Sequence, residues 1–107
     1  MSTRTLLTVP ARVKAGEAVE IRTLLQHPME SGHRLDAQGQ RLPRSIVRRF
    51  EVWFNGELAC AVDLHAAIAA NPYWVFWLQV EQAGELQLLW QGDDGFEHRE
   101  RRRIELA

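Results

Sequence analysis

The chain has 107 residues, 46% of them hydrophobic and 25% charged, with a net charge of −1. This length predicts one domain over residues 1–107 with a single modest core. A nearly neutral chain lacks the basic excess of nucleic-acid-binding domains, so nucleic acid is not an expected partner. The apolar run from Trp74 to Val80 is far too short to cross a bilayer, so no membrane association is expected. The N-terminal residues lack the apolar core of a signal peptide, and taken alone this indicates a cytoplasmic protein.

The apolar residues recur mostly at every second position, which predicts strands. The first strands are expected at residues 5–9 and 17–26. A long segment with little apolar content then runs from His27 to about Pro43. Inside it, the sequence DAQG at 36–39 is typical of a tight turn, so we expect this segment to fold back as a small hairpin.

The clearest strand is expected at residues 45–54. One face carries Ile46, Phe50, Val52 and Phe54, broken by Arg48, and the other carries Val47, Arg49, Glu51 and Trp53. Asn55-Gly56 follows, which is the strongest short-range signal of a β-hairpin. The return strand at 57–64 is expected to turn four residues toward the core, namely Leu58, Cys60, Val62 and Leu64.

The remaining chain continues this pattern. Residues 65–73 have the composition of a single helical turn, which Asn71-Pro72 would end. Strands are expected at 74–80, 85–91 and 96–106, the last two joined by a turn at 92–95. About seven short, turn-separated strands predict an all-β, immunoglobulin-like antiparallel sandwich, although the Cys…Trp…Cys core of antibody domains is missing.

The sequence offers little for catalysis. Cys60 lies in the middle of an apolar strand, whereas a reactive thiol needs an exposed electropositive setting. The acidic residues Glu30 and Asp36 are not paired by any recognisable spacing, and no nucleophile-elbow, phosphate-loop or zinc-protease motif is present. We therefore expect a protein that is not an enzyme and uses no cofactor.

A metal site is the alternative to a site without chemistry. The four histidines, His27, His33, His65 and His98, together with Cys60 match the ligand types of the iron site in superoxide reductases, which also use an immunoglobulin-like sandwich. That family has a Cys-x-x-His spacing, whereas Asp63 stands at this offset from Cys60. An odd separation along a strand also places Cys60 and His65 on opposite faces. No metal site is therefore expected.

The outward faces of the predicted strands are unusually apolar. Residues opposite the expected core positions include Val47, Trp53, Val75, Trp77 and Leu89. A contiguous exposed apolar area with tryptophan is typical of a protein–protein contact. The alternative, that some of these side chains are covered or that a strand is inverted, stays open at this point.

The order of the motifs resembles one family, SoxZ, a subunit of the thiosulfate-oxidation system. The matching segments are HPMESGHR at 27–34, DAQGQRLPRSIVRRFEVWFNGE at 36–57, the Asn71-Pro72-Tyr73 break and LLWQGDDGF at 88–96. They cover nearly the whole chain. One departure is the C-terminal segment EHRERRRIELA, which is more basic than the family pattern.

The resemblance implies an immunoglobulin-like subunit that pairs with SoxY, whose C-terminal cysteine arm carries covalent sulfur intermediates. The pair would dock transiently with the other Sox enzymes in the periplasm, and the subunit would be exported together with SoxY because it has no export signal of its own. Cys60 is not on a C-terminal arm, so it is not the carrier thiol in this picture. Independently of the resemblance, an exposed tryptophan surface would favour self-association, so a homodimer is expected when the partner is missing. A generic immunoglobulin-like interaction module and a superoxide-reductase-like iron enzyme remain the alternatives.

The segment HPMESGHR is then expected to be a shaped loop at a protein contact. His27, Met29, Glu30 and Arg34 are the candidate contact residues, with Glu30 and Arg34 spaced to form an ion pair. Pro28 restricts φ and Gly32 permits a sharp bend. A loop that only caps one end of the sandwich is the alternative.

Overall fold

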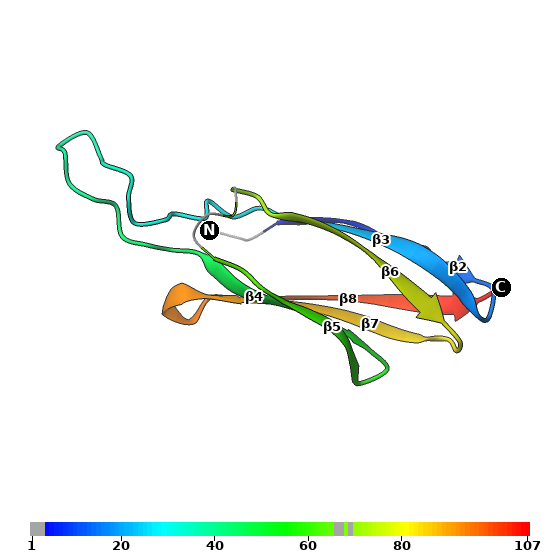
Figure 1. Ribbon diagram of the computed structural model, residues 1–107. Helices are drawn as coiled ribbons and strands as arrows, with labels where there is room; N and C mark the ends of the chain where they lie inside the picture. Colours follow the sequence, from blue (N-terminus) through cyan, green and yellow to red (C-terminus); the bar gives the residue numbers. More distant parts are fainter. Residues whose placement is uncertain (1–3, 66–67, 69) are drawn as a thin grey trace.

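The computed structural model describes residues 4–65, 68 and 70–107 (Figure 1). The described residues form eight strands and one short 3₁₀ turn, η1 (Asp93–Gly95). The strands are β1 (Thr5–Thr8), β2 (Arg12–Val13), β3 (Glu17–Leu25), β4 (Val47–Phe54), β5 (Glu57–Asp63), β6 (Tyr73–Val80), β7 (Gly84–Gly92) and β8 (Glu97–Leu106). In this part of the chain, no helix has the length and apolar character needed to span a membrane.

The strands form two sheets that pack face to face (Figure 1). A three-stranded sheet has the order β1-β3-β6, and a five-stranded sheet has the order β2-β8-β7-β4-β5. All pairings are antiparallel except the short contact between β2 and β8. The predicted immunoglobulin-like β-sandwich is therefore confirmed. The strand β2, which is only two residues long, was not predicted, because two residues carry no periodicity.

The core lies between the sheets and follows the predicted alternation in most strands. Ile21 and Leu25 of β3 and Leu86 of β7 are fully buried. Phe50 and Trp90 stack at the centre, with ring centroids 4.9 Å apart. A stacked aromatic pair adds about 0.5–1.5 kcal/mol to the burial of the rings themselves.

Two β-bulges, one in β4 and one in β5, change the predicted faces. Between β4 and β7, Val47 pairs with Gly92 and Arg49 pairs with Gln91, so Arg48 is the extra residue. An extra residue shifts the phase of the strand by one position. Val47 is consequently buried in the core with no exposed surface, and Arg48 points to solvent. The expectation that Val47 lies on the outer face is wrong for this reason.

The second bulge acts on β5. Val52 pairs with Cys60 and Trp53 pairs with Leu58, so Ala59 is the extra residue. Leu58 therefore lies beside Trp53 and is 47% exposed, contrary to the predicted core position. Cys60 remains partly buried against the core, as expected.

The predicted turns are confirmed. Asn55 and Gly56 both have positive φ, 50° and 80°, as the tight hairpin between β4 and β5 requires. The turn after β7 contains η1 and has Asp94 at φ 56°. The helical turn expected at 65–73 includes 66–67 and 69, which lie outside the described residues.

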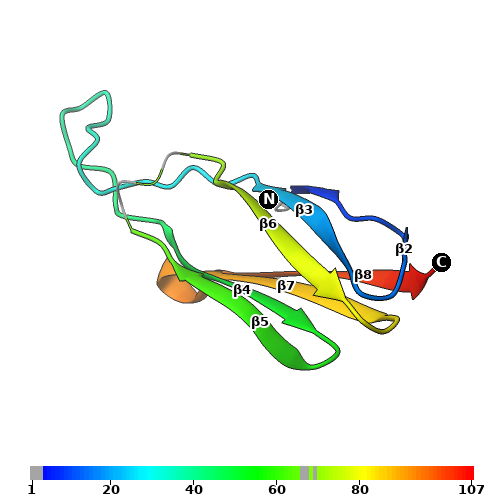
Figure 2. The same ribbon diagram turned by 45° about the vertical axis from the view of Figure 1, so that its right-hand side comes forward.

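The long segment after β3 folds back on itself as predicted. We call residues 28–45 the extended hairpin, and Figures 1 and 2 show that it projects beyond one end of the sandwich. Isolated bridges join Glu30 to Ser45 and Leu35 to Arg41. At its tip, the Asp36 carboxylate accepts hydrogen bonds from the amides of Gln38 and Gln40, each at 2.9 Å.

Candidate protein-binding surfaces

The outer face of the three-stranded sheet carries a group of apolar side chains. Leu6, Leu24 and Tyr73 are aligned across β1, β3 and β6 by the register of the strands. Val75 and Trp77 follow Tyr73 at alternate positions along β6 and so lie on the same face. We call this set the outer apolar face: Leu6, Leu24, Tyr73, Val75 and Trp77.

This face is open to solvent. Leu6 is 72% exposed, Trp77 66%, Tyr73 53% and Val75 43%. Single exposed apolar residues are ordinary on protein surfaces, but a group that spans three neighbouring strands is typical of a contact site. The predicted outward position of Val75 and Trp77 is confirmed, whereas their role in binding stays a prediction.

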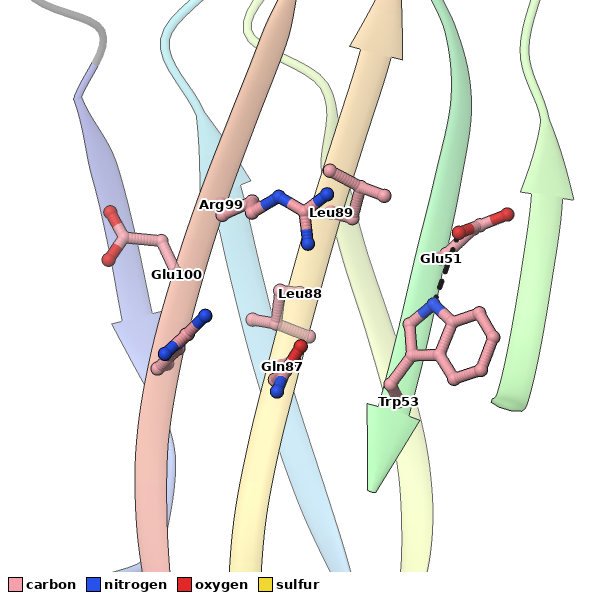
Figure 3. Close-up of a pocket in the computed structure, with 8 residues that line it drawn as sticks. Glu51, Trp53, Gln87, Leu88, Leu89, Arg99 and Glu100 are labelled. Carbon is pink, nitrogen blue, oxygen red and sulfur yellow. Dashed lines mark hydrogen bonds between the residues drawn. The ribbon is translucent and has the colours of Figure 1, made fainter. Parts of the chain in front are cut away.

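The other predicted residues lie on the opposite side of the molecule. Trp53 and Leu89 belong to the outer face of the five-stranded sheet, where a shallow pocket of about 160 Å³ is lined by both (Figure 3). Leu89 lies between Glu51 of β4 and Arg99 of β8 and is only 7% exposed. The Trp53 indole is half-buried, and its Nε1–H donates to Glu51 at 3.1 Å. The expectation of one contiguous apolar area is therefore wrong, because the residues are divided between two outer faces.

At the start of the extended hairpin, His27 and Met29 are buried rather than exposed. The His27 backbone amide donates to Asn71 Oδ1 at 2.9 Å, and the His27 ring packs edge-on against Phe96. The Met29 amide donates to His27 Nδ1 at 3.0 Å, and Met29 Sδ accepts from the Val47 amide at 3.2 Å. His27 and Met29 therefore fix the base of the hairpin to the sandwich, and the expectation that they are surface contact residues is wrong.

Farther along the hairpin, the predicted ion pair is confirmed. The Arg34 guanidinium donates to both carboxylate oxygens of Glu30, and the Nε donor lies 3.2 Å from Oε2. Arg34 is exposed, as is the neighbouring Leu35 at 58%. The part of the hairpin that is available to another molecule is thus its outer half, not its base.

Asp93 connects the base of the hairpin to the turn between β7 and β8. Its carboxylate accepts from the Arg44 guanidinium and from the Ile46 amide, at 2.9 Å and 3.1 Å. Burial alone would raise the pKa of Asp93, but the hydrogen bonds and the charges of Arg44 and Arg48 outweigh burial and lower it. Asp93 is therefore held as a carboxylate.

The candidate catalytic and metal-binding residues do not form a site. Among the described residues, no three side chains of His, Cys, Asp or Glu are arranged to hold a metal ion. His27 Nδ1 already accepts a backbone hydrogen bond, and burial lowers the pKa of His27. Burial also raises the pKa of the Cys60 thiol, which disfavours the nucleophilic thiolate.

Sequence reasoning missed three members of the outer apolar face: Leu6, Leu24 and Tyr73. Leu24 lies between the core positions Thr23 and Leu25 of the predicted strand at 17–26, so the alternation alone could have identified it as an outward-facing apolar residue. The proximity of Leu6 and Tyr73 depends on which strands are neighbours, and periodicity does not contain that information.

Solved structures with this fold come from several proteins. A superoxide reductase (neelaredoxin) from Ignicoccus hospitalis is 18% identical, with a TM-score of 0.73 over 98% of this chain and 82% of that chain. A putative superoxide reductase from Thermotoga maritima is 14% identical, with a TM-score of 0.71 over 96% of this chain and 85% of its own. The sulfur carrier protein SoxY from Chlorobium limicola f thiosulfatophilum is 11% identical, with a TM-score of 0.65 over 96% of this chain and 78% of its own. At these identities, the likeness shows a shared fold.

Sequence comparison identifies the family. No curated protein matches the chain. The family model described as sulphur oxidation protein SoxZ matches residues 7–103, which is nearly the whole chain. The match includes the extended hairpin and all the strands, apart from the first residues of β1 and the last residues of β8. The chain therefore belongs to the SoxZ family of sulphur oxidation proteins.

Proposed function

We propose that this chain is a non-catalytic subunit of a sulfur carrier complex and binds SoxY. In this proposal SoxY holds the sulfur intermediates of thiosulfate oxidation on its C-terminal cysteine, and the present chain supplies a rigid docking surface. The pair works in the periplasm and is exported together. Membership in the SoxZ family supports the proposal, because it gives a role in sulphur oxidation.

The observation that carries the proposal is the outer apolar face. Trp77 and Tyr73 are large aromatic side chains that are more than half exposed and adjacent to Val75 on one strand. Tryptophan and tyrosine are enriched among the residues that dominate binding energy when a partner buries them. Placing this face against SoxY removes the apolar surface from water, which is the main favourable term in association.

The extended hairpin supports a second part of the proposal, transient docking of the Sox enzymes. It projects from the sandwich and exposes Arg34 and Leu35 at its outer half (Figure 2). A projecting hairpin with a fixed base reaches a second protein without disturbing the outer apolar face. Glu30 holds the Arg34 side chain in a defined direction through their ion pair.

The test is the affinity of the purified chain for SoxY. Trp77→Ser is expected to weaken binding by about tenfold or more, equivalent to at least about 1.4 kcal/mol. The matched variant is Trp53→Ser, which removes the outward tryptophan of the other sheet, and it is expected to bind SoxY like the parent chain. A complex that tolerates Trp77→Ser and is lost with Trp53→Ser would move the site to the five-stranded sheet. No affinity of the parent chain for SoxY would refute the proposal.

A further inference from the structure

The two sheets have four edge strands, and one of them differs from the others. β2 has two residues and β1 has four, and both are too short to template a long pairing. β5 has a charged residue at each end, Glu57 and Asp63, and it contains a bulge. Charged side chains and bulges both hinder the pairing of an edge strand with another chain. β6 is eight residues long, with the sequence YWVFWLQV and no charged side chain. Figure 2 shows β6 at the margin of its sheet, with β3 on its inner side.

The backbone of β6 can be divided into bonded and open groups. The Leu25 amide donates to the Pro72 carbonyl at 3.1 Å, which makes this pair a hydrogen-bonded pair of the β3–β6 ladder. Bonded and non-bonded pairs alternate in an antiparallel ladder. The register then directs the backbone groups of Trp74, Phe76, Leu78 and Val80 toward β3. The hydroxyl of Thr23 bonding to the Trp74 carbonyl agrees with this direction.

The open groups therefore belong to the alternate residues of β6: Tyr73, Val75, Trp77 and Gln79. In the described part of the chain, the backbone amides and carbonyls of these four residues make no hydrogen bond to a loop or a side chain. Their side chains lie on the exposed outer face. This row thus presents unpaired backbone groups together with the exposed apolar side chains of Tyr73, Val75 and Trp77; only Gln79 is polar.

We propose that SoxY docks by strand addition: an extended, uncharged segment of SoxY pairs with β6 and continues the three-stranded sheet. The inference rests on the proposed function and specifies its geometry. Main-chain hydrogen bonds supply affinity in this mode, and alternate side chains supply specificity. β6 has no charged side chain, so a charged residue on the pairing segment would lose water without gaining an opposite charge from β6, and a neutral segment is favoured. The SoxY fold is the same kind of sandwich as this chain, so it also has sheet edges.

Amide hydrogen exchange tests this geometry in the intact proteins. In the complex with SoxY, the amides of Val75, Trp77 and Gln79 are expected to exchange at least about tenfold more slowly than in the free chain. The amides of Phe76 and Leu78 serve as an internal control, because their bonds to β3 already protect them in the free chain.

Two substitutions at one position separate the backbone from the side chain. Val75→Pro removes a donor that faces the open edge, so the β3–β6 ladder keeps its bonds. It is expected to weaken SoxY binding by about tenfold or more. Val75→Ala keeps the amide and is expected to have a much smaller effect. Thermal unfolding verifies that both variants fold. If Val75→Pro does not fold, the amide-exchange measurement on the parent chain is the test of strand addition.

The outcomes distinguish the two proposals. Strand addition is overturned if SoxY binds without changing amide exchange at Val75, Trp77 and Gln79 and if the two variants bind SoxY with equal affinity. The role as a SoxY-binding subunit then remains intact. No SoxY binding by the parent chain overturns both. The inference is also overturned if these amides become protected in the isolated chain as its concentration rises and if SoxY does not compete with this self-association. The edge then pairs with a second copy of the chain.

Discussion

Arg44 and Asp93, 49 positions apart in the sequence, form a two-bond contact, with Nε and Nη2 each 2.9 Å from a carboxylate oxygen. This contact attaches the returning strand of the extended hairpin to the turn after β7. Asp93 accepts the Ile46 amide as well, so one carboxylate holds both a side chain and the backbone at the point where β4 begins.

Replacement of Asp93 is expected to loosen the base of the hairpin. Asp93→Ala removes the acceptor of the Ile46 amide and of Arg44, and should lower the free energy of unfolding by about 1–3 kcal/mol. Denaturant unfolding measures this change. Asp94→Asn is the control, because it removes one negative charge from the same turn but affects an exposed side chain. Equal losses in both variants would show that charge, not the contacts of Asp93, is responsible.

His27 should make the stability depend on pH. Its pKa is lowered below the ordinary 6.5, chiefly by burial, so the folded chain favours the neutral ring. Below about 6.5 the unfolded chain binds a proton that the folded chain does not, and stability therefore falls as the pH drops toward the folded pKa. Protonation also removes the Nδ1 acceptor of the Met29 amide. Urea midpoints from pH 7.5 to 5.5 measure the effect.

The matched variants for this experiment are His27→Asn and His33→Asn. Asparagine at 27 retains an acceptor but does not titrate, so the decline with acidification should be smaller than in the parent chain. His33 is exposed in the same hairpin, and its replacement should leave the decline unchanged. The assignment is wrong if His33→Asn, and not His27→Asn, flattens the profile.

Gly84 is required by the neighbouring turn. A Cβ at this position would lie 1.7 Å from Asn55 Oδ1, which itself accepts the Glu85 amide. Gly84→Ala should therefore displace Asn55 and destabilise the fold by about 1–3 kcal/mol, as overpacking does. Thermal unfolding measures the loss. The double variant Gly84→Ala with Asn55→Gly removes the obstructing side chain and keeps a residue that tolerates positive φ, so the two losses should be less than additive.

Cys60 is expected to react slowly. Burial raises the pKa of its thiol, and the side chain packs partly against the core. Alkylation by iodoacetamide at pH 7.5 should be at least about fivefold slower in the folded chain than in urea. Rapid alkylation of the folded chain would contradict the buried setting and reopen a role for this thiol.

The alternation of apolar residues was sufficient to predict the strands and most of the core. In β3 and β6 the predicted faces agree with the structure at Ile21, Leu25 and Leu78. The errors at Val47 and Leu58 arise at bulges, where one extra residue inverts the phase. Assigning faces from the alternation assumes that each residue pairs with one residue of the neighbouring strand. The alternation therefore cannot locate an inserted residue.

The candidate site was predicted less completely, because it depends on neighbours in space. The polar composition of the hairpin suggested exposure, but His27 and Met29 are buried through contacts with Asn71, Phe96 and Val47, all distant in sequence. The outward positions of Val75 and Trp77 in β6 followed from the alternation alone, whereas Tyr73 lay outside the predicted strand. Their grouping with Leu6 and Leu24 required the strand order of the sheet.

The projecting hairpin also determines how this small protein moves through water. The molecule measures 57 × 22 × 20 Å, and its radius of gyration is 16.2 Å. A compact chain of this length has a radius of gyration of about 13 Å. Frictional drag on so elongated a particle makes it elute early from a sizing column, where a monomer is easily mistaken for a dimer. Light scattering, which reports mass independently of shape, is therefore the suitable measurement of its assembly state.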